Sequence, residues 1–211
     1  MADEIAGWLT DSRRFREFAA THLDKIRKKL RSATDSEARR DVRAELRIAR
    51  LLLADRRIEL AFEAYGSVRG GPDFTVAFGG ERPFNLEVTR IRGAPGALGG
   101  PLLPKLRQLP PSVPNALLVA IEGDRAVAFD VATAVRALRS RADEKDEAFF
   151  AARSFEGTRQ FYERFLRLGA VVVWCESAAG NDRAAPWINA SARMAVPERA
   201  MRACVAGLRA G

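Results

Sequence analysis

Histidine and cysteine are nearly absent from this chain. It contains one histidine, His22, and two cysteines, Cys175 and Cys204, which lie far apart in the sequence. Catalytic triads and Cys–His pairs need histidine beside a nucleophile, while zinc sites and disulfide frameworks need suitably spaced cysteines. Any chemistry is therefore expected to use carboxylates, lysine and a hard metal ion such as Mg²⁺ or Mn²⁺. We expect both cysteines to be inert core thiols.

Long apolar runs are also missing. No run approaches the ~20 residues that a membrane span requires, and the first residues, Met1 to Glu4, lack the layout of a signal peptide. We therefore expect a cytoplasmic protein with no membrane partner. The 211 residues are 47% hydrophobic and 29% charged, which is typical of a packed globular chain, and the net charge of +8 favours a polyanionic partner such as nucleic acid, DNA above all.

Hydrophobic periodicity predicts an α/β or α+β fold with a central mixed sheet between helices. Apolar steps of three and four residues predict helices over 13–30 and 34–53, the second starting at a Thr34–Glu37 capping box. Further helices are expected over 101–109, 131–138, 156–168 and 197–208. Strands are expected over 58–65, 116–121, 170–174 and 187–189. We divide the chain into a helical extension, residues 1–33, and an α/β domain, residues 34–211.

Two short runs, 73–78 and 84–91, are joined by a glycine-containing loop and predict a β-hairpin. Pairing apolar residues with one another across the strands fixes the register. The resulting pairs are Val76 with Phe84, Thr75 with Asn85 and Phe74 with Leu86. Continuing this register places Asp73 opposite Glu87. Two like charges in this position repel, so the pair indicates either a bound cation or a face that water screens.

Other polar side chains are expected to lie near this acidic pair. Glu45 lies beside the apolar stripe of the helix that precedes the sheet, where an unpaired carboxylate is costly. Lys105 and Gln108 are three residues apart in the helix after the hairpin and are therefore expected on one helix face. These groups are predicted to converge on one cleft.

This pattern resembles the PD-(D/E)XK nuclease superfamily, which has the restriction-endonuclease-like fold. The matching residues are Glu45 for the helical acid, Pro72–Asp73 for the Pro-Asp, and Glu87–Val88–Thr89 for the Glu-x-Lys. The likeness covers roughly residues 35–138. It implies Mg²⁺- or Mn²⁺-dependent cleavage of phosphodiester bonds, with Asp73 and Glu87 as metal ligands and Glu45 as an accessory ligand or organiser.

The sequence departs from the family at Thr89, which stands where the family has its lysine. A hydroxyl cannot supply the positive charge that orients and activates a water molecule. Arg90 is not an easy substitute, because strand alternation sends it to the face opposite Glu87. Lys105 is the better replacement, because a helix docked beside the hairpin could bring its ammonium into the same cleft. The alternative is that Lys105 is an ordinary exposed lysine on that helix.

Four residues are predicted to contact the substrate: Thr89, Gln108, Arg92 and Arg107. For the two arginines the alternative is that they are ordinary solvated surface residues, as most surface arginines are. Two other functions stay open: a catalytically degenerate member of the fold that binds nucleic acid or a protein, and an interaction module with a solvated acidic face. The sequence also leaves a homodimer open.

Overall fold

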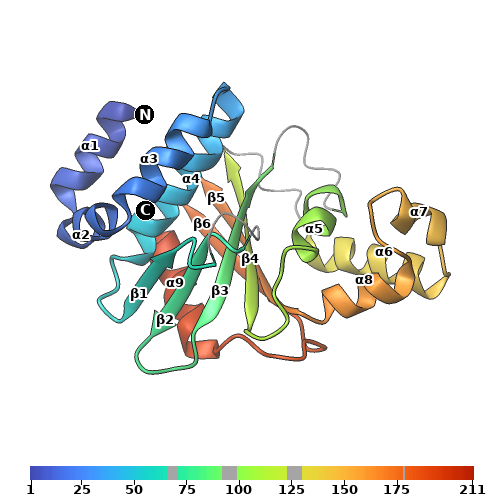
Figure 1. The fold of residues 1–211 in the computed structure, drawn as a ribbon. Coiled ribbons are helices and arrows are strands. Elements are labelled where there is room, and N and C mark those ends of the chain that lie inside the picture. The colour runs from blue at the N-terminus through green and yellow to red at the C-terminus, as the bar shows by residue number, and fades with distance from the viewer. Residues whose placement is uncertain (66–70, 92–98, 123–129, 178) are drawn as a thin grey trace.

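The chain folds into a six-stranded mixed sheet with helices on both faces, which confirms the predicted mixed α/β class (Figure 1). The computed structural model describes residues 1–65, 71–91, 99–122, 130–177 and 179–211. The strands are β1 (Ile58–Phe62), β2 (Phe74–Phe78), β3 (Phe84–Arg90), β4 (Asn115–Glu122), β5 (Leu168–Glu176) and β6 (Arg183–Ile188). They lie side by side in chain order; β3, β4 and β5 are parallel, and the other neighbours are antiparallel.

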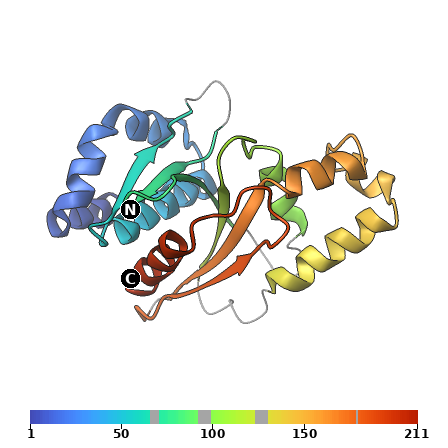
Figure 2. The same cartoon turned by 90° about the horizontal axis from the view of Figure 1, so that it is seen from below.

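Two groups of helices cover the two faces of the sheet (Figures 1 and 2). The first group is α1 (Ala2–Asp11), α2 (Arg13–Thr21), α3 (Leu23–Ser32), α4 (Ser36–Leu52) and α9 (Glu198–Arg209). The second group is α5 (Gly99–Leu106), α6 (Val131–Asp143), α7 (Glu147–Ala151) and α8 (Thr158–Phe165). Among the described residues, no helix is both long and apolar enough to cross a membrane.

The two central strands, β4 and β5, are buried on both faces. Successive side chains of a strand point to opposite sides. Ala116 and Leu118 therefore pack into the core under α4 and α9, while Leu117 and Val119 pack into the core under α5, α6 and α8. This arrangement explains why both strands read as continuous apolar runs in the sequence. Both cysteines are free thiols buried in these cores, as expected.

The first three helices pack on the same core as the sheet. Phe15 of α2 and Ile26 of α3 are buried in it. The Arg14 guanidinium donates to the main-chain carbonyls of Leu53, Asp55 and Ile58 at 2.5–2.7 Å, and so fastens α2 to the chain between α4 and β1. Residues 1–33 thus share their hydrophobic core with the α/β domain.

Several predicted boundaries were wrong. The helix expected over 13–30 is interrupted at His22, where φ is −108° and ψ is 19°, so α2 and α3 are separate helices. Asp35, rather than Thr34, caps α4, because its carboxylate accepts from the Ala38 N–H at 2.7 Å. β6 begins at Arg183, well before the predicted 187–189. It is a largely exposed edge strand, and its first four residues, Arg-Ala-Ala-Pro, give no hydrophobic alternation.

The predicted hairpin is present, with the predicted register. β2 and β3 pair Phe74 with Leu86, Thr75 with Asn85 and Val76 with Phe84. Gly79 and Gly80 turn the chain at φ values of 51° and 81°, which glycine adopts without steric cost. The antiparallel pairing brings the start of β2 beside the middle of β3, where Leu86 and Glu87 lie.

Candidate active site

Asp73 lies immediately before β2 and bonds to the neighbouring strand through its side chain. Its Oδ2 accepts a 2.8 Å hydrogen bond from the Val88 N–H of β3. The described ladder between the two strands ends at Phe74 and Leu86. The Asp73 carboxylate thus continues the hairpin by contacting the residue next to Glu87, and this backbone bond fixes its orientation.

Glu45 is carried by α4, which packs against β3. The residue is only 6% exposed, and its Oε2 lies 2.5 Å from the Lys29 ammonium of α3. The same ammonium donates to Asp73 Oδ1 at 2.9 Å. Lys29 therefore joins the helical acid to the hairpin acid.

Glu87 is 3% exposed, and its Oε1 forms an ion pair with the Lys105 ammonium of α5. Its second oxygen, Oε2, is buried without a hydrogen-bond partner. A buried carboxylate oxygen in this condition is costly, and such atoms mark places where an ion or water is needed. Lys105 therefore contacts one of the acidic residues. The sequence analysis predicted that a helix docked beside the hairpin would bring it there.

The protonation of the two glutamates is strongly shifted. Burial and the nearby Asp73 carboxylate raise the pKa of Glu45 to about 8, although Lys29 opposes the shift. Burial and Asp73 also raise the pKa of Glu87 to about 7, against the effect of Lys105. For Lys29, burial lowers the pKa, but Asp73 and Glu45 outweigh burial and the net pKa is raised. Perturbed carboxyl groups of this kind cluster at functional sites.

The acids outnumber the cations at this place. Four carboxylates, those of Glu45, Glu63, Asp73 and Glu87, contact the Lys29 and Lys105 ammoniums. With all six groups ionised, the cluster has a surplus of two negative charges, which one divalent cation balances. The atoms that contact the two ammoniums are all carboxylate oxygens, which are the ligands that hard ions such as Mg²⁺ prefer.

A cavity of about 240 Å³ adjoins this cluster. Glu45, Thr89 and Lys105 line it, together with Asp41 and Arg90. Thr89 and Lys105 therefore line the same cavity. Lys105 thus brings a positive charge close to Thr89, the position at which the family has its lysine. The volume is large enough for several water molecules but small for a whole nucleotide.

Two other predicted site residues, Gln108 and Arg107, make no described contact with the cluster, and a third lies outside the described residues. Gln108 is exposed beyond the end of α5, which stops at Leu106, so it does not share a helix face with Lys105. Arg107 is also exposed and none of its described contacts reach the cluster. Arg92 lies outside the described residues.

Arg90 points away from Glu87, as strand alternation predicted. Its Nε donates to Asp41 of α4 at 3.0 Å, and the guanidinium also pairs with Glu37 and Glu122. It therefore ties α4 to the ends of β3 and β4.

Lys29 and Glu63 were missed by sequence reasoning. Lys29 belongs to a charged helix far from the motif in sequence, and only the packing of α3 brings it to the acids. Glu63 follows β1 with a φ of 44°, an uncommon conformation for a residue other than glycine, and its Oε1 lies 3.4 Å from the Lys29 Nζ. A local signal for either contact is absent from the sequence.

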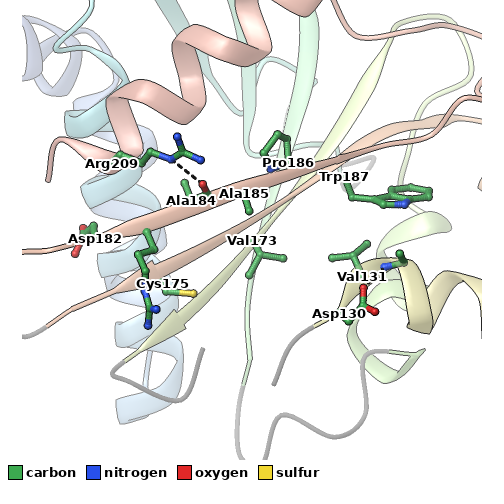
Figure 3. A pocket seen from close by; sticks show the side chains of 12 residues that line it. Asp130, Val131, Val173, Cys175, Asp182, Ala184, Ala185, Pro186, Trp187 and Arg209 are labelled. Carbon is green, nitrogen blue, oxygen red and sulfur yellow. Dashed lines mark hydrogen bonds between the residues drawn. The ribbon is translucent and has the colours of Figure 1, made fainter. Parts of the chain in front are cut away.

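A larger cavity, of about 640 Å³, lies between the start of α6 and strands β5 and β6 (Figure 3). Three of its charged groups already have partners: Asp130 caps α6, Asp182 pairs with Arg47, and Arg209 donates to the Ala184 carbonyl. The fourth, Arg183, is exposed. Apart from the free thiol of Cys175, whose pKa burial raises, the described walls present no buried, unpaired group for chemistry. The smaller cavity beside Glu45 and Lys105 is the better candidate for an active site.

No family model, curated protein or solved structure matches this chain. The assignment of the site therefore rests on its own residues. Within the part of the chain that the structure describes, no three Asp, Glu, His or Cys side chains form a group that could hold a metal ion. Instead, the carboxylates of the cluster form ion pairs with Lys29 and Lys105.

Proposed function

We propose that this protein is a metal-dependent phosphodiesterase that cleaves nucleic acid, with DNA as the expected substrate, on a restriction-endonuclease-like fold. One observation carries the proposal: Glu45 and Lys105 line one cavity, Lys29 joins Glu45 to Asp73, and Lys105 pairs with Glu87, so that side chains from four different elements or their ends come together. The order α4, β1, β2, β3, α5, β4 supports the fold assignment. The net charge of +8 supports a polyanionic substrate.

The residues suit a hard divalent cation. Asp73 and Glu87 would hold it, because Glu87 Oε2 is buried without a hydrogen-bond partner and the four carboxyl groups of the cluster outnumber its two ammoniums. When bound, such an ion polarises a phosphoryl oxygen and lowers the pKa of an attacking water. Glu45 holds its position beside Asp73 through Lys29.

Lys105 supplies the positive charge that Thr89 lacks. Its ammonium contacts Glu87 and lines the cavity, so it can stabilise negative charge that develops on a phosphate there. Removing one preorganised donor of this kind typically costs about 10²-fold or more in kcat. The Thr89 hydroxyl lines the same cavity and can donate a hydrogen bond to the substrate.

The test is incubation of supercoiled plasmid, single-stranded DNA and RNA with Mg²⁺ or Mn²⁺. We expect cleavage that Glu87→Gln abolishes and Lys105→Met reduces by about 10²-fold. Glu59→Gln, at an exposed position of β1, is the matched control and should retain full activity. Cleavage that survives Glu87→Gln, or no cleavage with either metal, would refute the proposal.

A specific observation favours a second candidate, a degenerate member of the fold that binds nucleic acid without chemistry. Both lysines already neutralise part of the acidic cluster, and the described residues form no ready group of three metal ligands. Fluorescence anisotropy with labelled DNA distinguishes the two. DNA binding whose affinity falls steeply with salt, without cleavage under any metal, supports the second candidate.

A further inference from the structure

The Lys29 ammonium occupies the place of a cation among three carboxylates. Its Nζ lies 2.5 Å from Glu45 Oε2, 2.9 Å from Asp73 Oδ1 and 3.4 Å from Glu63 Oε1. The Phe62 ring lies 5.3 Å from the same atom, which adds a cation–π contact. The Lys29 side chain is only 23% exposed. This lysine is therefore surrounded as a bound ion would be.

The position of Lys29 is set by the packing of its helix. One turn earlier on α3, the Lys25 ammonium donates to the main-chain carbonyls of Phe62 and Glu63 at 2.9 and 3.0 Å. Ile26 of the same helix is buried in the core. Residues four apart lie on one helix face, so anchoring Lys25 at the end of β1 directs Lys29 to the acids. The ammonium is thus delivered by a docked helix.

The other side of the acidic cluster is organised differently. Asp73 directs Oδ1 to Lys29, while its Oδ2 accepts from the Val88 N–H. Glu87 pairs with Lys105 through Oε1 and keeps Oε2 buried and without a partner. Glu45 Oε2 also has no hydrogen bond, but it lies 2.5 Å from the Lys29 ammonium. The Glu45 side therefore already has its cation, whereas Glu87 Oε2 has neither a hydrogen bond nor an ion pair among the described residues.

We infer that Lys29 is a built-in cation of this site, which holds Glu45 and Asp73 and confines a divalent ion to the side of Asp73 and Glu87, one ion per chain. This inference rests on the proposed function and adds the number of ions that the site accepts. Two metal ions on one set of carboxylates are a common arrangement for cleaving phosphodiesters. Here the ammonium takes the place of the second ion.

The geometry also says what removal of Lys29 would do. Glu45, Asp73 and Glu63 would be left facing one another without a positive charge, and buried like charges of this kind are strongly unfavourable. Closing on a metal ion requires oxygens at ~2.1 Å, so these side chains would have to move inward from their present N···O distances. A divalent ion is then expected at the vacated position.

The test counts Mn²⁺ ions bound per chain, by calorimetry and by the electron paramagnetic resonance signal of free Mn²⁺, in full-length protein. Lys29→Met removes the ammonium and keeps the length of the side chain. Arg27→Met is the matched control, because it removes one positive charge from an exposed position of the same helix and leaves the Lys25 anchor in place. Circular dichroism establishes that each variant is folded, and Lys29→Gln, which retains a donor, replaces Lys29→Met if that protein does not fold.

We expect one Mn²⁺ in the wild type and in Arg27→Met, and two in Lys29→Met or Lys29→Gln. The same number of ions in wild type and the Lys29 variants, or two in the wild type, would overturn the inference while leaving the proposed metal site standing. No ion in the wild type but one in the Lys29 variant would support exclusion by Lys29 and count against the proposed function. No ion in any of the proteins would overturn both.

Discussion

Replacing Glu45 by glutamine should change how the stability of the protein depends on pH. The folded-state pKa of Glu45 is raised from 4.5 to about 8, because the carboxyl is buried and lies near Asp73. The native protein therefore binds this proton more tightly than the unfolded chain does. The stabilising contribution is complete below pH 4.5 and is lost as the pH rises through 8.

The magnitude follows from the size of the shift. One pKa unit corresponds to ~1.4 kcal/mol, so the wild type should lose on the order of 3 kcal/mol from this group between about pH 5.5 and 9. Glu45→Gln resembles the neutral carboxyl and lacks this loss. The difference in unfolding free energy, variant minus wild type, should therefore rise by about 3 kcal/mol over the same pH interval.

The assay is urea denaturation of both proteins at the two pH values, in buffer with a chelator that removes divalent ions. Glu198→Gln is the control, because its side chain is 81% exposed and its loss should leave the pH dependence unchanged. If the stability curves of Glu45→Gln and the wild type run parallel from acid to alkaline pH, the reasoning about burial at this site is refuted.

Three further substitutions test the scaffold by chemical denaturation. Arg14→Ala removes charged hydrogen bonds to three carbonyls and should lower the unfolding free energy by about 2–4 kcal/mol, whereas a loss below 1 kcal/mol would mean that α2 is not fastened there. Asn115→Ala should cost about 2–4 kcal/mol, because its buried amide donates to three main-chain carbonyls; an unchanged midpoint would contradict this. Phe150→Ala, at a fully buried position between Phe155 and Phe161, should cost about 3–5 kcal/mol, and the exposed substitution Arg159→Ala is its control.

The sheet and the hairpin register could be read from the sequence because strand alternation is a local signal. One-residue slippage would turn Phe74 and Leu86 away from the core, so the apolar pattern specifies a single pairing. The runs that form β4 and β5 were equally clear, since burial on both faces leaves only apolar residues. Edge strand β6 gave no such pattern, and its early start was missed.

The candidate site was predictable only in part. Glu45, Asp73 and Glu87 were found through their spacing, and Lys105 through the expectation that a helix would follow the hairpin. Lys29 could not be found in this way, because its contact with Glu45 depends on how α3 docks after the break at His22. Gln108 was expected on the same helix as Lys105, but α5 ends at Leu106, two residues before it.

The doubly covered strands β4 and β5 have a consequence for motion. Amide hydrogens in strands with both faces buried exchange with solvent only when large parts of a protein open, so these strands should be the slowest to exchange deuterium. β3 pairs with β4, and its Val88 amide is held by Asp73. We therefore expect the acids to lie on the most persistent part of the molecule. Lys29 comes from α3, of which only Ile26 is buried, so we expect this helix to open more readily. Deuterium uptake that is fast in α3 and slow in β3 would show these two components of the site moving on different timescales.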